Sequence, residues 1–248
     1  MAANQSGDER RMTANPLIQR LNHAGFLSQV EQDALHALVL KSRCIQARED
    51  IAQSRSTQTI PLILSGIACR YKFRPDGQRR IVHFLLPGDL YDLHASAHFA
   101  SHWHLGALTR CQVVDVQRQA LLDLAARHPG IAQGLWWATL VELEIEREWL
   151  VNDSRPADRR LGHLFCELLV RLQTIGLARD NSCDLRLTQV DLADAIAVSF
   201  VHINRIMQSL RNNNLIQCQR GYVKIIDYDR LCEFSEFDPA FLHLSKNA

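Results

Sequence analysis

The sequence lacks the features that mark membrane-spanning, exported and disulfide-stabilised proteins. No apolar run approaches the roughly 18 residues that a membrane-spanning helix needs, and residues 1–11 are too polar to form the core of a signal peptide. The seven cysteines are an odd number, and no two of them form a C-x-x-C pair. These absences argue against a membrane span and predict a cytoplasmic protein with reduced thiols.

The chain also has little net charge. The formal charge is only +1 over 248 residues, which excludes a uniformly basic nucleic-acid coat. Between residues 186 and 226, however, basic residues outnumber acidic ones by five to two. A local basic surface on a near-neutral chain is typical of a protein that places one face on phosphates. The length predicts two domains, which we place at residues 1–152 and 153–248.

The region from residue 43 to 116 has the pattern of a small antiparallel roll. Cys69, Tyr71 and Phe73 alternate with basic residues, as in a strand that is buried on one face. Pro75-Asp76-Gly77 is a turn signal, because proline presets φ and glycine accepts a positive φ. Residues 81–86 read as the returning strand of this hairpin. The pattern predicts an α+β fold whose N-terminal half is a β-roll.

A long helix is predicted from residue 130 to 151, followed by a hinge at 152–156. Two seams of mostly apolar residues run along it at helical spacing. Ile131, Leu135, Ala138, Glu142, Ile145 and Trp149 form one seam, and Trp136, Leu140, Leu143, Arg147 and Leu150 form the other. A helix that is apolar on two faces needs two partners. We expect these to be the roll and a second copy of the chain; the alternative is a helix buried inside a monomer.

Residues 188–226 read as two short helices followed by a strand, a glycine turn and a strand. Thr188 and Ser199 are good N-caps, and Asp191 stands three residues after Thr188. The second helix has an apolar face of Ile203, Ile206, Met207 and Leu210 and a polar face of His202, Asn204, Arg205, Gln208 and Arg211. This arrangement is typical of a winged helix-turn-helix. An ordinary helical hairpin in a core is the alternative.

The order of these parts resembles the Crp-Fnr family of bacterial transcription regulators, which includes the cyclic-AMP receptor protein. The resemblance extends from about Pro16 to Tyr228. Its most specific stretches are Leu64-Ser65-Gly66, Pro75-Asp76-Gly77 with Phe84 to Asp89, and Leu187-Thr188-Gln189 through Asn204-Arg205 to Leu215-Ile216. The resemblance implies a regulator and no enzymatic activity. It also implies a homodimer on palindromic double-stranded DNA, with half-sites roughly 34 Å apart, and RNA polymerase as a further partner.

By resemblance, Arg205 matches the family's guanine-reading arginine, and Thr188 and Ser199 match positions that hold phosphates. The expected DNA-binding residues are Thr188, Gln189, Ser199, Phe200, Val201, His202, Asn204, Arg205 and Arg220. The sequence departs from the family where Val201 replaces a common glutamate, Phe200 an arginine and Ala197 the turn glycine. Phe200 and Val201 cannot make the hydrogen bonds of those polar groups to base edges, but they could pack on thymine methyl groups. The operator is therefore expected to differ from that of the cyclic-AMP receptor protein. They also keep open the alternative of a ligand-binding or scaffold dimer with weak or lost DNA binding.

The roll does not carry the family's effector signatures. Leu93 falls where the ribose-binding glutamate is expected, and Trp103-His104 where the phosphate-binding Arg-Ser pair is expected. An anionic phosphate needs a cation or a helix N-terminus there, so we expect no cyclic-AMP response. Residues 1–43 contain no cysteine, which excludes the family's iron–sulfur geometry.

Histidines and cysteines leave two further readings open. His94, His98, His102 and His104 could hold a metal or haem if they lie on a helix, but solvated polar side chains are the simpler interpretation. Oxidation of Cys183 or Cys218 could add charge near DNA phosphates, against the simpler reading of inert thiols. We therefore predict no cofactor and no metal. The sequence does not identify an effector, an operator or the direction of regulation.

Overall fold

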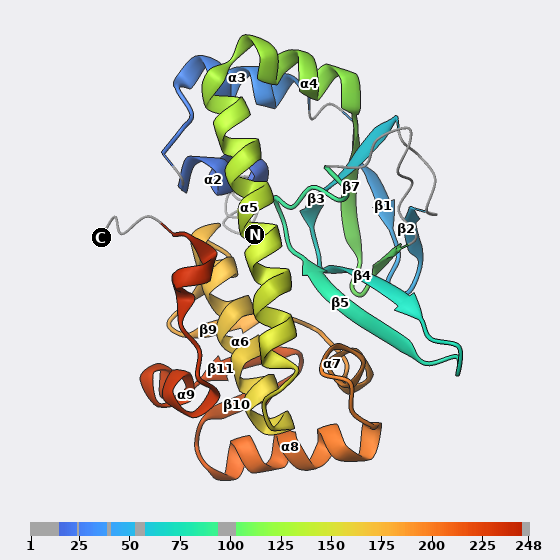
Figure 1. Cartoon of the computed structure of the whole chain (residues 1–248), viewed down its shortest axis with the longest axis vertical. Coiled ribbons are helices and arrows are strands. Elements are labelled where there is room, and N and C mark those ends of the chain that lie inside the picture. The colour runs from blue at the N-terminus through green and yellow to red at the C-terminus, as the bar shows by residue number, and fades with distance from the viewer. Residues whose placement is uncertain (1–14, 24, 39–40, 53–57, 94–102, 245–248) are drawn as a thin grey trace, which may run out of the picture.

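The N-terminal half of the chain is a roll of two antiparallel sheets (Figure 1). The computed structural model describes residues 15–23, 25–38, 41–52, 58–93 and 103–244. One sheet has the strand order β1-β7-β3 and the other β2-β6-β4-β5. The strands are β1 (Arg43–Ile45), β2 (Asp50–Ala52), β3 (Thr59–Ser65), β4 (Ala68–Phe73), β5 (Arg79–Leu85), β6 (His104–Ala107) and β7 (Cys111–Gln117). This confirms the predicted α+β class and the roll.

The β4–β5 hairpin forms as predicted, but its faces differ from the expected alternation. Gly77 has a φ of 80° in the predicted turn, and its N–H donates to the Arg74 carbonyl at 2.9 Å. A bulge between Arg70 and Tyr71 shifts the register. As a result Arg70 is buried, whereas Phe73 is 54% exposed. The strict alternation was therefore wrong at Arg70, within β4, and at Phe73, its last residue.

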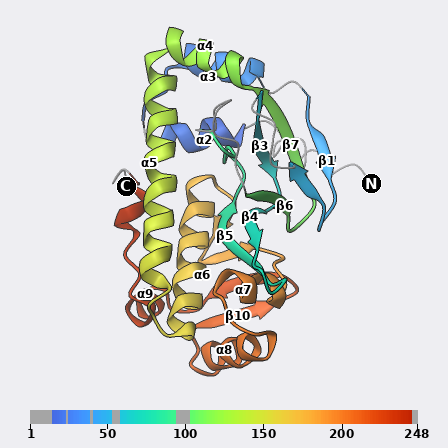
Figure 2. The ribbon, with the colours of Figure 1, turned by 45° about the vertical axis from the view of Figure 1, so that its right-hand side comes forward.

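Among the described residues, the helices that accompany the roll are α2 (Pro16–His23), α3 (Gln29–Leu38), α4 (Arg118–Arg127) and α5 (Pro129–Asn152). The Ser28 hydroxyl and the Glu31 carboxylate exchange hydrogen bonds with each other's backbone N–H groups at the start of α3, in a capping box. Figure 2 shows that α5 runs along one side of the molecule, from the roll down to the C-terminal half. None of the described helices has the length and apolar composition of a membrane span.

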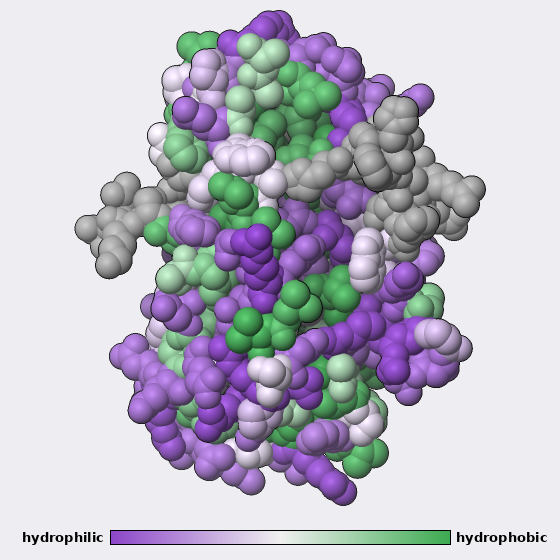
Figure 3. Space-filling view, in the orientation of Figure 1, coloured by the Kyte–Doolittle hydropathy of each residue, from purple (hydrophilic) through white to green (hydrophobic). Residues whose placement is uncertain are grey.

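The two seams of α5 have different environments. Ile131, Leu135 and Ile145 are buried against their own chain. The second seam is largely uncovered, with exposed fractions of 66% at Trp136, 39% at Leu140, 40% at Leu143 and 74% at Leu150. Hydrophobic side chains are accordingly visible along the front of the molecule, where α5 passes (Figure 3). Ile145 therefore belongs to the chain's own core, so its replacement is a test of folding.

The C-terminal half is built on α6 (Ala157–Thr174) and a sheet of order β10-β11-β9-β8. Its other elements are β8 (Ala178–Arg179), β9 (Ser182–Asp184), α7 (Gln189–Ala195), α8 (Phe200–Asn212), β10 (Ile216–Gln219), β11 (Tyr222–Ile225), α9 (Tyr228–Ser235) and the 3-10 helix η1 (Pro239–Leu242). Gly176, with a φ of 69°, follows the end of α6 in the left-handed conformation common just after helices. The short β8–β9 hairpin and the two C-terminal helices were not predicted.

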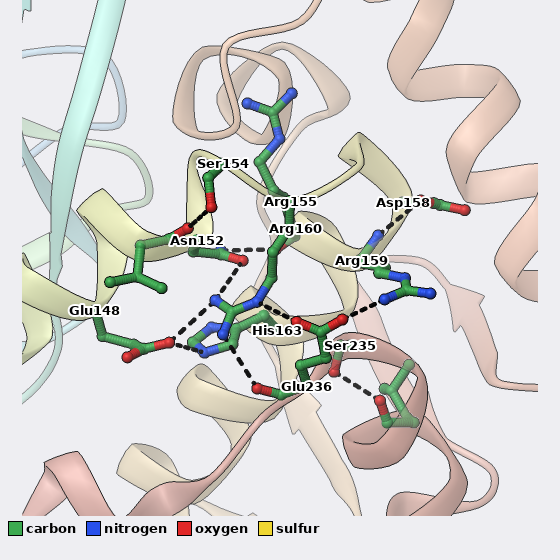
Figure 4. Close-up of polar contacts among 12 residues, drawn as sticks. Glu148, Asn152, Ser154, Arg155, Asp158, Arg159, Arg160, His163, Ser235 and Glu236 are labelled. Atoms are coloured by element: carbon green, nitrogen blue, oxygen red, sulfur yellow. Dashed lines mark hydrogen bonds and ion pairs between the residues drawn. The ribbon is translucent and has the colours of Figure 1, made fainter.

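Arg155 links three segments at the predicted hinge between α5 and α6 (Figure 4). Its guanidinium donates to Glu148 of α5 at 3.0 Å and to Glu236, just after α9, at 3.2 Å. Glu236 also pairs with Arg159 of α6. Burial, together with the nearby charge of Arg155, lowers the pKa of His163 to about 3, so the ring is neutral. Its Nε2 lies 3.1 Å from Glu148.

Candidate nucleic-acid interface

Side-chain caps set the start of both helices of the candidate interface. The Thr188 hydroxyl accepts from the Asp191 N–H, and the Asp191 carboxylate accepts from the Thr188 N–H, so the predicted capping box opens α7. The Ser199 hydroxyl accepts from the His202 N–H at the start of α8. Both caps lie at the positions predicted from the sequence, which confirms the two-helix reading of this region.

The faces of α8 are divided as the sequence predicts. Ile203 and Ile206 are buried at 0% and 4% exposure, and they hold the helix on its own domain. Arg205, between them in sequence, is exposed, and in the described part of the chain it forms no ion pair. Its guanidinium is therefore free to reach an outside partner.

The first turn of α8 exposes the two apolar residues that depart from the family pattern. Phe200 is 55% exposed and Val201 60% exposed. Thr188, Ser199 and His202 are also exposed, while Gln189 and Asn204 are half-buried. In Figure 3 the foot of the molecule over α8 is mostly hydrophilic, with hydrophobic side chains at its right-hand end. All nine predicted contact residues thus retain some solvent access at this end of the molecule.

A tight turn places Arg220 at the tip of the wing. Gln219 and Tyr222 are paired in the β10–β11 ladder, and Arg220 and Gly221 between them have φ values of 49° and 91°. Two consecutive positive φ angles define a type I′ hairpin turn. A Cβ atom on Gly221 would lie 3.0 Å from the Arg186 Cα, so the turn also requires glycine for space. The Arg220 side chain is exposed at this tip.

Two arginines of the roll, Arg48 and Arg79, bind acidic residues of α7, and we refer to this contact as the roll–helix clasp. Arg79 of β5 donates to Asp191 and to Asp194, at 2.8 Å in each case. Arg48, in the β1–β2 turn, donates to Asp191 at 3.0 Å and to the Thr188 hydroxyl at 3.1 Å. Asp191 and Asp194 therefore pair with arginines that lie far away in the sequence.

The clasp sets the ionisation of Asp191, which is fully buried. Burial works to raise its pKa, but hydrogen bonds from Arg48, Thr188 and Arg79 together hold the pKa below its usual value. For Asp194 burial prevails over Arg79, and its pKa is raised. We regard Asp191 as the main anionic anchor of the clasp because it accepts from both arginines.

The candidate effector residues of the roll do not form a phosphate site in the described part of the chain. Trp103 lies near the Lys72 ammonium, with 5.6 Å from nitrogen to ring centroid. His104 of β6 stacks on Tyr71 of β4. The Nδ1 atom of His104 is buried and has no hydrogen-bond partner. Leu93 packs against the cluster under α2 and β3. His94, His98 and His102 lie outside the described residues, so the expectation that they hold no metal stays a prediction.

A buried charge network, which sequence reasoning missed, connects α6 to the roll. Arg171 donates to Glu167 at 2.8 Å, to Asp89 at 2.7 Å and to the Phe84 carbonyl at 2.9 Å. Arg20 of α2 also pairs with Asp89, and Trp149 donates to Glu167 at 2.7 Å. Burial raises the pKa of Glu167 despite these donors. The network ties α2, α5 and α6 to the end of β5.

The two cysteines considered near the DNA-facing surface are poor nucleophiles. Cys183 is only 3% exposed, and burial raises its pKa to about 12. Burial also raises the pKa of the half-buried Cys218. Thiols of this kind react slowly with oxidants because the thiolate is the reactive form.

Comparisons with known proteins agree with this arrangement. Residues 159–234 match the family model described as a Crp-like helix-turn-helix domain, and residues 45–128 match that of the cyclic nucleotide-binding domain. The chain belongs to the Crp-Fnr family. It is therefore a transcription regulator with a helix-turn-helix DNA-binding domain, and the family is not one of enzymes.

Several relatives within this family align with most of this chain. The transcriptional activator protein FnrL of Cereibacter sphaeroides is 26% identical over 86% of this chain and 88% of its own length. The nitrogen fixation regulation protein FixK of Azorhizobium caulinodans is 25% identical over 68% of this chain and 67% of its own. The structure of FixK2 from Bradyrhizobium japonicum shares the fold, with a TM-score of 0.69, 22% identity and coverage of 79% and 98%.

Proposed function

We propose that this regulator binds a palindromic operator in the cytoplasm as a homodimer, with α8 in the major groove and the wing tip on the phosphate backbone. The observation that carries the proposal is the free, exposed Arg205 between two buried isoleucines of α8. A guanidinium can donate two parallel hydrogen bonds to guanine O6 and N7, which no neutral side chain of this helix can do.

The uncovered seam of α5 supports the dimer. Trp136, Leu140, Leu143 and Leu150 follow a four-three spacing that fits a second copy of the same helix. A two-fold dimer would present its two α8 helices to half-sites about one helical turn apart. The division at residue 152 and RNA polymerase as a partner remain proposals that fit this reading.

Base reading and phosphate binding can be separated by comparing two variants. Arg205→Ala should lose roughly 1–3 kcal/mol of binding free energy per half-site and relax the preference at one base pair. Arg220→Ala should weaken all sequences alike and lower the salt dependence of binding by about one counterion. Selection of binding sites from random DNA, followed by titration at several salt concentrations, measures both effects. If Arg205→Ala kept the wild-type preference at every position, the base-reading role would be wrong.

The alternative of a dimer that has lost DNA binding rests on Phe200 and Val201, which are exposed and apolar. A gel shift with the chain's own promoter region distinguishes it from the proposal. Our proposal predicts a salt-sensitive shift that Arg205→Ala weakens. A chain that forms the dimer but shifts no fragment would favour the alternative.

A further inference from the structure

Two cysteines from different helices meet beside the helix-turn-helix. Cys166 lies on α6 and is fully buried, and Cys232 lies on α9 and is half-buried. Their sulfur atoms are 3.9 Å apart. The two residues are 66 positions apart in the sequence, so neither their spacing nor any motif indicated the pair.

The close approach of the two helices has a local cause. Gly162 stands one helical turn before Cys166 and therefore on the same face of α6. A Cβ atom on Gly162 would lie 3.0 Å from the Ser235 Cβ and 3.1 Å from the Leu231 Cδ1. The missing side chain lets α9 come close to α6, and the next turn then brings the two sulfur atoms together.

We propose that Cys166 and Cys232 form a redox-active dithiol that hydroperoxides oxidise to a disulfide. Cys232 is the half-buried member and acts as the nucleophile, and the buried Cys166 resolves the intermediate. A disulfide here would enclose β8–β9, α7, α8 and the β10–β11 wing in one loop. It would also fasten α9, whose following residue Glu236 pairs with Arg155 and Arg159 at the hinge (Figure 4).

The electrostatics of the pair agree with these roles. A hydrogen bond with Cys166, and a further one with the Tyr228 hydroxyl, lower the pKa of the Cys232 thiol against the effect of burial. The pKa of Cys166 is raised by the same hydrogen bond and by burial. A more acidic, accessible thiol beside a buried second thiol is the usual arrangement of a nucleophilic and a resolving cysteine.

The chemistry balances with a hydroperoxide as the two-electron oxidant. The Cys232 thiolate attacks the terminal peroxide oxygen; the S–O bond forms, the O–O bond breaks, and the alkoxide leaves and takes up a proton. The Cys166 sulfur then attacks the Cys232 sulfur. The S–S bond forms, the S–O bond breaks, and hydroxide leaves as water with the Cys166 proton. A dithiol reductant reverses the reaction by thiol–disulfide exchange.

Peptide mapping of the full-length protein tests the proposal without any mutation. The reduced protein is treated with a few equivalents of hydrogen peroxide, alkylated and digested with trypsin without reductant. We expect peptides 161–171 and 231–246 to appear joined, two hydrogen masses below their sum, and to separate on adding dithiothreitol. The melting temperature should rise on oxidation and return on reduction, because the cross-link restricts the unfolded chain.

Variants distinguish the roles of the two thiols. Cys232→Ser should abolish both the joined peptide and the rise in melting temperature. Cys166→Ser should leave a sulfenic acid on Cys232 that dimedone traps. Cys183→Ser, at a buried thiol outside the pair, is the matched control and should still give the joined peptide. The proposal is overturned if peptides 161–171 and 231–246 stay separate at a peroxide concentration that fully oxidises the exposed Cys44.

Discussion

Ala197 holds the turn between α7 and α8 in a conformation that glycine adopts more easily. Its φ is 53°, and the Val198 N–H donates to the Ala193 carbonyl at 3.0 Å, as in a Schellman motif. A left-handed conformation costs an L-residue about 1–2 kcal/mol. A glycine at this position would avoid this cost, so the turn of this chain is strained at one residue.

Ala197→Gly should therefore stabilise the protein. Relief of the left-handed strain exceeds the extra entropy that glycine gives the unfolded chain, and we expect a net gain of about 0.5–1 kcal/mol in unfolding free energy. Urea unfolding with an unchanged m-value measures it. Ala132→Gly, within α5, is the matched control and should lose about 0.5–1 kcal/mol. A loss at both positions would show that Ala197 carries no strain.

At the scale of elements, local signals explain what the sequence could predict. Thr188 and Ser199 start α7 and α8 through hydrogen bonds to residues three positions away, and Gly77 and Gly221 mark turns whose causes lie within a few residues. The clasp, the Arg171 network and the inward Arg70 depend on partners far away in the sequence. No periodicity encodes such pairs, so Asp191 and Asp194 could be placed on α7 but not matched to Arg48 and Arg79.

The two seams of α5 predict opposite outcomes for similar substitutions. Leu140→Asp places a charge on the uncovered seam and should shift the chain from dimer to monomer with its fold retained. Ile145→Asp buries an unpaired charge in the chain's own core and should unfold it. Analytical ultracentrifugation and circular dichroism at micromolar concentration separate the two effects. Leu122→Asp, at an exposed leucine of α4, is the control; a wild-type chain that sediments as a monomer would contradict the dimer.

Arg171 predicts how strongly α6 depends on the roll. Arg171→Met removes a guanidinium that forms ion pairs with Asp89 and Glu167. Because both buried carboxylates lose this partner, the substitution should lower the unfolding free energy by about 3–5 kcal/mol. Arg43→Ala, which breaks the half-exposed pair with Asp115, should cost at most about 1 kcal/mol. Chemical denaturation of both variants gives the comparison. Equal small losses would mean that the network contributes nothing beyond a surface ion pair.

At the scale of the whole molecule, the helix-turn-helix is attached to the roll by more than the hinge. Arg80 of β5 donates to the Ala195 carbonyl at 2.6 Å and to Asp153 at 2.8 Å, next to the clasp that Arg48 and Arg79 make with α7. The orientation of α8 relative to α5 therefore depends on charges from both halves of the chain. In a dimer, that orientation sets the direction in which each α8 helix meets its half-site.

Asp191 makes the clasp dependent on pH, with a definite sign. Its pKa in the folded protein lies below its usual value, so its ionised form stabilises the fold above the unfolded pKa of about 4. This stabilisation is lost as the pH falls from about 4 through the lower folded pKa. Asp191→Asn should cost roughly 2–3 kcal/mol at pH 7, since Arg48 loses its anion and Arg79 keeps only Asp194. The difference in unfolding free energy between wild type and Asp191→Asn should shrink below pH 4, as measured by urea unfolding from pH 3 to 7.

Asp33→Asn, at an exposed carboxylate of α3, is the matched control and should cost under about 0.5 kcal/mol at pH 7. A wild-type advantage over Asp191→Asn that stayed constant down to pH 3 would show that the clasp does not depend on the charge of Asp191.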